Sequence, residues 1–255
     1  MLNGVSMSLP AGRVVALCGP NGAGKSSLLA CLCGEYALSG GSVHYGGTAV
    51  SHLSAREKAC HRVVLEQTPT LSAAFSLSEL VELGAPLDLS PADLTQLKSS
   101  TLAELGFDGM GDRFVADLSG GQQHRAHLAR VLIGLHAYRK LGHNCALFLD
   151  EPTSSLDIGH QINVLDRVRA LAADGVGVLV VLHDLNLAAA FADEVVLLKE
   201  GTVVQTGAPE DVLTAQLLSA VYDTEILVET ALNGQAIIQP RLGATLARVA
   251  DRPGV

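Results

Sequence analysis

Apolar residues along this chain gather in short, dense runs, and the runs alternate with longer stretches of helical spacing. The runs have strand length, are rich in Val and Leu and end at glycine or charged residues, which is typical of buried parallel strands. They occupy residues 13–19, 62–67, 145–152 and 176–184. The helical stretches are 25–34, 158–175 and 185–193. This alternation predicts an α/β fold with a mostly parallel sheet covered by helices on both faces.

Other segments depart from this alternation. Residues 41–47 predict a strand in a small antiparallel layer, and residues 194–207 predict a hairpin that turns at Glu200–Gly201. Between about residues 76 and 135, short helical pieces broken by Gly, Pro and Asp predict a helical subdomain inserted into the α/β part. The pattern is weak after residue 230. We therefore predict one domain over residues 1–230, followed by a weakly patterned tail over 231–255.

Composition indicates a globular protein and narrows its partners. Hydrophobic residues make up 48% of the 255 residues and charged residues 17%, which allows a substantial core. The formal net charge of −9 argues against nucleic acid as a partner. No apolar run exceeds strand length and no signal peptide opens the chain, so we expect membrane association only through a partner. The five scattered cysteines are expected to be reduced packing residues.

The stretch GPNGAGKS, residues 19–26, follows the first predicted strand and opens the first predicted helix. Its spacing is that of a phosphate-binding loop, in which glycines let backbone N–H groups turn inward around phosphate oxygens. The Lys25 ammonium neutralises the terminal phosphates, and the Ser26 hydroxyl completes the coordination of Mg²⁺. A plain glycine turn is the alternative, which the strand–loop–helix context disfavours. The residues predicted to bind nucleotide are Gly19, Pro20, Asn21, Gly22, Ala23, Gly24, Lys25, Ser26 and Ser27.

Polar residues follow three other predicted strands, at the sheet edge where ligands bind in α/β folds. Asp150 ends a buried strand, where Mg²⁺ is a natural partner for its charge. Glu151 is expected to point elsewhere, because side chains alternate along a strand, and to polarise a water for attack on the γ-phosphate. His183 is placed toward the γ-phosphate and Gln67 beside the metal. A core-edge histidine and a glutamine in a polar turn are the plain alternatives.

Residues 118–130, LSGGQQHRAHLAR, begin another predicted helix. Ser119 is a good N-cap, and Gln122 three residues later completes a capping box. A well-capped helix with no other role is the plain interpretation. However, Gly120 and Gly121 follow the cap, and each glycine costs a helix roughly 1 kcal/mol relative to alanine. Close approach of another group is the usual reason for such glycines, so this helix start is a second candidate anion site.

Taken in order, the phosphate loop, Gln67, LSGGQ, LFLDEP, SSLD and His183 resemble the ATP-binding subunits of ABC transporters over nearly the whole chain. The resemblance implies two copies packed head to tail, with each ATP between the phosphate loop of one copy and the LSGGQ helix of the other. It implies that Glu151 is the general base. The implied catalytic residues are Glu151, His183, Lys25 and Gln67, and the implied metal-site residues are Ser26, Gln67 and Asp150. Ser119, Gly120, Gly121 and Gln122 would close over the partner's ATP, with Asp157 in the turn that links the two sites.

A narrower resemblance is to importers of heme, vitamin B12 and iron siderophores, and most of all to the ATP-binding subunit of hemin importers. It lies in residues 129–152, 181–193 and 207–222. It implies ATP hydrolysis that drives hemin import through a separate permease. Vitamin B12 or an iron siderophore as cargo is the alternative. From other classes, a soluble ABC ATPase that acts on nucleic acid or ribosomes and a regulator that does not hydrolyse ATP also stay open.

The same resemblance implies further partners and a location. Two membrane permease subunits would dock on residues 67–83, with a periplasmic substrate-binding protein acting indirectly, at the cytoplasmic face of the bacterial inner membrane. One departure concerns the start of the chain. The family begins with a strand and an aromatic residue that stacks on adenine, upstream of the segment LNGVSMSLPAG, whereas this chain starts at Met1. We therefore expect weakened ATP affinity and a small antiparallel layer that lacks one strand.

Overall fold

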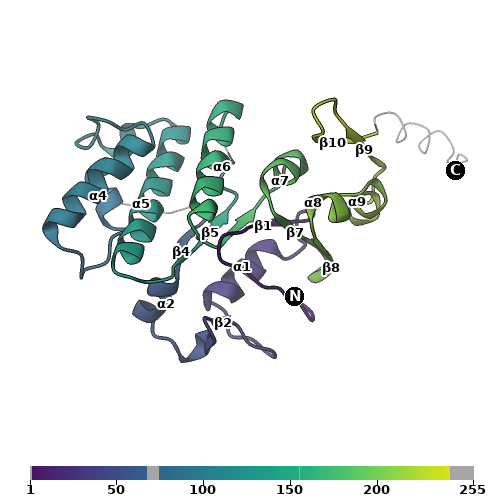
Figure 1. Ribbon diagram of the computed structural model, residues 1–255, viewed down its shortest axis with the longest axis horizontal. Helices are drawn as coiled ribbons and strands as arrows, with labels where there is room; N and C mark the ends of the chain where they lie inside the picture. The colour runs from purple at the N-terminus through teal and green to yellow at the C-terminus, as the bar shows by residue number, and fades with distance from the viewer. Residues whose placement is uncertain (1, 68–74, 155, 242–255) are drawn as a thin grey trace, which may run out of the picture. The chain divides into compact units, whose positions relative to one another are not determined.

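The computed structural model describes residues 2–67, 75–154 and 156–241 (Figure 1). Contacts within the chain divide it into two compact units. The larger unit contains residues 9–14 and 26–181, and the smaller unit contains residues 2–8, 15–25 and the chain from 182 onward. In both units the strands that carry the predicted site residues are parallel and alternate with helices. The predicted α/β class is therefore confirmed.

The larger unit is built on three parallel strands in the order β4 (Arg62–Leu65), β5 (Ala146–Asp150) and β6 (Val178–Val181). All of β6, and all of β5 after its first residue, is buried. Burial on both faces explains why these segments are continuous runs of Val, Leu and Phe without polar alternation. The helix α6 (Ile158–Ala173) connects β5 to β6, because parallel strands need a crossover.

Shorter elements precede β4 in this unit. The helix α1 (Lys25–Cys33) ends as predicted at Gly34, whose φ of 70° is favourable for glycine. The predicted antiparallel layer is a two-stranded sheet of β2 (His44–Tyr45) and β3 (Thr48–Ala49). A 3₁₀ turn (Val50–His52) follows.

The helix α2 (Ala55–His61) was not indicated by apolar spacing, and none of its residues is buried. It is stabilised locally instead. Ser54 and Glu57 form a capping box in which each side chain bonds the backbone N–H of the other. That pair of residues, three positions apart, is the signal in the sequence that could have predicted the helix.

The helical subdomain predicted near residues 76–135 is present in the larger unit. It contains α3 (Leu77–Glu82), α4 (Pro91–Glu104), a 3₁₀ turn (Val115–Asp117) and α5 (Gly120–Lys140). A serine caps the start of each of the three α-helices. Figure 1 shows α4 and α5 side by side. The helices of the subdomain and the segments between them form one hydrophobic core. Its buried residues are Leu77, Leu80, Val81, Leu102, Phe107, Leu118, Ala126, Ala129 and Ile133.

The smaller unit contains a fully buried strand, β1 (Val14–Cys18), which is parallel to β7 (Glu194–Lys199). The strand β8 (Thr202–Gly207) runs antiparallel along β7. The predicted hairpin turn is confirmed at Glu200 and Gly201, whose φ angles are 48° and 79°. Two positive φ angles in a two-residue loop match the twist of the flanking strands.

In residues 182–241 of the smaller unit, the structure also describes three helices and a second hairpin. The helices are α7 (Leu185–Phe191), α8 (Pro209–Val212) and α9 (Ala215–Tyr222). The strands β9 (Ile226–Thr230) and β10 (Ala236–Pro240) pair as an antiparallel hairpin across the boundary predicted at residue 230. The adjacent Asn233 and Gly234 are a strong hairpin-turn signal that the weak apolar pattern obscured.

The cysteines are core residues in three of five cases. All five are free thiols, and Cys18, Cys33 and Cys145 are buried. Burial raises the pKa of each of these three thiols to about 12, because the thiolate would lose its hydration. They therefore stay protonated at neutral pH and act as small apolar packing groups.

Two glycines set how closely the segment after α3 approaches α5. A Cβ on Gly84 would lie 1.7 Å from the backbone oxygen of Arg130. A Cβ on Gly134 would lie 2.6 Å from the backbone oxygen of Gly84. Both distances are far shorter than a carbon–oxygen contact allows. The close packing of α3 against α5 therefore requires glycine, which has no side chain, at positions 84 and 134.

We predict that Gly84→Ala lowers the free energy of unfolding by about 1–3 kcal/mol or more, because the added methyl group must push two backbones apart. The measurement is urea unfolding followed by circular dichroism. Gly40→Ala is the matched control, since no atom of the described chain lies within 4 Å of the position that its Cβ would take. Equal midpoints for the two variants would contradict this packing argument.

Candidate functional site

The loop between β1 and α1 curls around the side chain of Lys25. The Lys25 ammonium is only 6% exposed and donates hydrogen bonds to the backbone oxygens of Gly19 (2.8 Å) and Pro20 (3.0 Å). Gly22 and Gly24 have φ angles of 79° and 102°, which a residue with a side chain rarely adopts. The predicted phosphate loop is thus a tight turn that leads into the N-terminus of a helix. That arrangement concentrates N–H donors and positive charge, as an anion requires.

Gly19 is needed for a second reason. Its φ is 148°, and a Cβ there would lie 2.3 Å from the backbone oxygen of Leu198 in β7. The far end of the loop is tied by a hydrogen bond from the Gly201 N–H to the Ala23 oxygen, at 2.9 Å. Both ends of the loop are therefore fixed against the β7–β8 hairpin.

At the end of β5, the carboxylates of Asp150 and Glu151 occupy different environments. Asp150 is 6% exposed and pairs with Val181 in the sheet. The expectation that strand alternation would direct Glu151 is wrong, because the strand ends at Asp150 and Glu151 has a φ of 53°. A tight turn therefore sets its direction. The turn is closed by Ser154, whose N–H (3.1 Å) and hydroxyl (2.9 Å) both donate to the Glu151 backbone oxygen.

The predicted residue Gln67 lies against Glu151. Its Nε2 donates to the Glu151 carboxylate at 2.8 Å. Gln67 comes from the segment after β4, and β4 pairs with β5 in parallel register, so the strand ends bring the two side chains together. An amide and a carboxylate separated by 84 positions in the sequence are thus in direct contact.

His183 is an exposed residue of the smaller unit. In the sequence it comes two positions after the last residue of β6. The preceding Leu182 is buried and its N–H bonds the Leu17 oxygen of β1 at 3.2 Å. The following Asp184 caps α7, with its carboxylate accepting from the N–H groups of Asn186 and Leu187. His183 is therefore held between a strand end and a capped helix.

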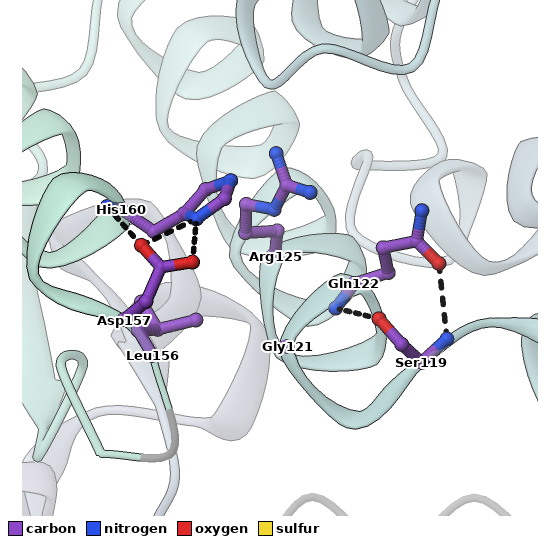
Figure 2. A pocket seen from close by; sticks show the side chains of 7 residues that line it. All are labelled: Ser119, Gly121, Gln122, Arg125, Leu156, Asp157 and His160. Carbon is purple, nitrogen blue, oxygen red and sulfur yellow. Dashed lines mark hydrogen bonds and ion pairs between the residues drawn. The ribbon is translucent and has the colours of Figure 1, made fainter.

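The start of α5 has the predicted capping box. The Ser119 hydroxyl accepts from the Gln122 N–H at 3.4 Å, and the Ser119 N–H donates to the Gln122 side chain at 3.0 Å (Figure 2). Ser119 and Gly120 are exposed. No described atom outside the helix itself lies within 4 Å of the position that a Gly120 Cβ would occupy. The described residues therefore provide no packing reason for this glycine, and the space above it is open to an external group.

Beside this helix start lies a pocket of about 330 Å³, which also reaches the start of α6. Asp157 caps α6 and accepts hydrogen bonds from the backbone N–H (2.9 Å) and the ring Nδ1 (2.8 Å) of His160. These hydrogen bonds hold the pKa of Asp157 below its usual value. The pocket thus combines two helix N-termini, which favour anions. Its lining residues are Ser119, Gly121, Gln122, Arg125, Leu156, Asp157 and His160 (Figure 2).

Sequence reasoning missed Arg125 and His160 in this pocket. The Arg125 guanidinium stacks over the Phe107 ring at 5.4 Å and donates to the Leu105 oxygen at 3.2 Å. The ring of His160 is brought to the pocket by its bond to Asp157. Neither belongs to a motif, so only their positions near the starts of α5 and α6 could have suggested them.

The residues present fit a magnesium ion that is shared with a phosphate ligand. Ser26 and Asp150 supply the hard oxygen ligands that Mg²⁺ prefers. In the described part of the chain, no group of three or more His, Cys, Asp or Glu side chains could hold a metal ion.

Comparison with known proteins assigns the family. Residues 2–154 match the model of the ABC transporter family. The chain belongs to the ABC transporter family. It is 40% identical over 242 residues to the hemin import ATP-binding protein HmuV of Rhodopseudomonas palustris strain CGA009, covering 95% of this chain and 90% of that protein. It is 42% identical over 246 residues to the HmuV protein of Bordetella pertussis, covering 94% of each.

Solved structures agree with this ABC fold. An ATP-binding subunit of an ABC transporter superposes with a TM-score of 0.74 at 25% identity, covering 87% of this chain and 90% of that chain. A metal-chelate type ABC transporter in an inward-facing conformation has a TM-score of 0.75 at 24% identity. The match covers 95% of this chain and 91% of that chain. The predicted resemblance to an ABC transporter ATP-binding subunit, an ATPase by family, is confirmed.

Two histidines of α5 make stability depend on pH. His127 is 8% exposed, and burial lowers its pKa to about 4, with the charge of Arg130 as a second cause. Burial also lowers the pKa of His124. The unfolded chain, in which a histidine has a pKa near 6.5, therefore binds more protons than the folded chain between about pH 4 and 6.5.

We predict that the free energy of unfolding reaches its highest value above about pH 6.5 and falls as the pH drops toward 4. The reason is that burial disfavours protonation of His127 in the folded state, whereas the unfolded chain binds that proton. Urea midpoints at pH 7.5, 6 and 5 measure this slope. In His127→Leu the loss between pH 7.5 and 5 is expected to be smaller than in the unchanged protein. An unaltered slope in the variant would remove His127 as the cause.

Proposed function

We propose that this protein is the ATP-hydrolysing subunit of an importer that moves hemin through a separate membrane permease. The observation that carries the proposal is about 40% identity along 95% of the chain to hemin import ATP-binding proteins. The arrangement of the site supports it, because Lys25 is enclosed by a glycine-rich loop, the Glu151 carboxylate accepts a hydrogen bond from Gln67, and the pocket at the start of α5 combines two helix N-termini.

In the proposed reaction the phosphate-loop amides and the Lys25 ammonium hold the β- and γ-phosphates of ATP. Ser26 and Asp150 would hold Mg²⁺, which neutralises charge on the phosphates when bound. The Glu151 carboxylate orients a water and accepts its proton, while Gln67 holds that carboxylate by the 2.8 Å hydrogen bond. His183 would donate to the γ-phosphate. Catalysis then consists of positioning and charge stabilisation.

The second anion site leads us to propose a head-to-tail homodimer. In such a dimer, Ser119, Gly120, Gly121 and Gln122 of one copy close over the ATP of the other, with Asp157 in the linking turn. The open space above Gly120 supports this arrangement, because no described atom outside the helix occupies it. Two-fold symmetry would produce two identical composite sites.

A mixing experiment tests the composite sites. We expect Glu151→Gln and Gly120→Ala each to lose ATPase activity when pure, the first through its base and the second through a methyl group in the path of the partner's ATP. Mixed at equal amounts, random pairing makes half of the dimers mixed, and each mixed dimer has one site with both parts intact. The mixture should recover about a quarter of the unchanged rate. A mixture no faster than its components would contradict the arrangement.

The membrane partners and the location are also proposed. In the described part of the chain no helix has the length and apolar character needed to cross a bilayer. We place the protein on the cytoplasmic face of the bacterial inner membrane, bound to two permease subunits that receive substrate from a periplasmic binding protein. The predicted docking segment is 67–83, of which residues 68–74 lie outside the described residues. Its described end includes Leu83, a 55% exposed leucine beside the subdomain core.

Growth of a bacterial strain that lacks this protein tests which compound is imported. We predict that a strain lacking this chain fails to grow with hemin as its only iron source, and that the unchanged gene restores growth while a Glu151→Gln copy does not. Parallel cultures fed an iron siderophore, or made dependent on external vitamin B12, distinguish the alternative cargoes. A growth defect confined to one of those cultures would replace hemin with that compound. No defect in any culture would favour a soluble ABC ATPase.

A further inference from the structure

The histidine at position 124 ties α5, the helix that begins at the LSGGQ residues, to the turn that holds the proposed base. His124 lies in the second turn of α5, five residues after the capping Ser119. Its ring Nε2 is 2.7 Å from the backbone oxygen of Pro152, the residue after Glu151. A carbonyl oxygen can only accept, so Nε2 carries the hydrogen and donates. Burial lowers the pKa of His124, so the ring is neutral at pH 7.

This hydrogen bond acts on a strained part of the chain. Glu151 has a φ of 53°, a left-handed conformation that is unfavourable for a residue with a side chain. Pro152 is buried and its oxygen faces α5 rather than solvent. A buried carbonyl needs a hydrogen-bond partner, and His124 supplies one. The contact therefore favours the turn geometry in which the Glu151 carboxylate meets Gln67.

We propose that His124 is a positioning residue for ATP hydrolysis. Acting through the Pro152 carbonyl, it fixes the Glu151 turn to α5. This inference rests on the proposed function, in which the N-terminus of α5 contacts the ATP of a second copy. Five residues of helix span only about 7.5 Å, so a shift of that N-terminus reaches the turn directly. Engagement of a partner's nucleotide is thereby coupled to the base in the same chain.

The test compares His124→Leu, which removes the donor, with His124→Gln, whose amide nitrogen can take the place of Nε2. In His124→Leu, kcat for ATP is expected to fall at least about tenfold, because a small displacement of a base is costly, while KM stays within about twofold. His124→Gln should retain most of kcat. His136→Leu is the matched control, since it removes another histidine of α5, one that faces Glu104.

A trapping measurement excludes general damage to the fold. We expect Glu151→Gln to accumulate an ATP-bound dimer on size-exclusion chromatography, and the double variant Glu151→Gln/His124→Leu to accumulate it equally. An unchanged kcat in His124→Leu overturns the inference, as does loss of the trapped dimer in the double variant. Equal losses in His124→Leu and His124→Gln overturn the hydrogen-bond assignment. Full activity in Glu151→Gln alone would overturn the proposed function itself, which keeps the two failures distinguishable.

Discussion

At the end of β5 the chain must leave a buried sheet and, within one residue, turn the carboxylate that we propose as the catalytic base toward Gln67. The left-handed conformation of Glu151 solves this problem at a cost of roughly 1–2 kcal/mol. Hydrogen bonds to the backbone oxygens of three consecutive residues of the turn offset this cost. Ser154 holds the Glu151 oxygen, His124 holds the Pro152 oxygen, and Gln161 of α6 donates to the Thr153 oxygen at 3.2 Å. The position of the base thus depends on contacts from both α5 and α6.

The two proposed phosphate-binding glycine clusters differ in what surrounds them. At Gly19 a side chain would collide with Leu198 of the same chain, so the glycine permits close packing within the fold. At Gly120 the surrounding space is open and the glycine is exposed. Glycine weakens a helix start by roughly 1 kcal/mol, and nothing in the described chain compensates for it there. A compensating contact from outside the chain is the physical basis for proposing a composite site.

Sequence alone predicted the features that are local. The strands are continuous apolar runs because they are buried on both faces, and the phosphate loop and the Ser119 capping box depend only on residues a few positions apart. It failed where distant residues decide. The direction of Glu151 is set by a turn whose partners come from three other elements, and no spacing rule pairs His124 with Pro152. The hairpin β9–β10 was not predicted, although Asn233–Gly234 is a sequence typical of a hairpin turn. Its strands are short and mostly exposed, so their apolar and polar positions do not alternate clearly.

The β9–β10 hairpin also helps to fix the segment of the smaller unit that carries His183. The Asn186 side chain donates to the Ile238 oxygen at 3.1 Å and accepts from the Ile238 N–H at 2.8 Å, so it pairs with β10 as a strand would. Asn186 lies in the first turn of α7, which Asp184 caps directly after His183. The larger unit braces Glu151 in the same way, through hydrogen bonds to its neighbours' backbone. In each unit, hydrogen bonds from polar side chains to the backbone of neighbouring residues fix the loop that carries a predicted catalytic residue, so the position of that residue depends on more than its own motif.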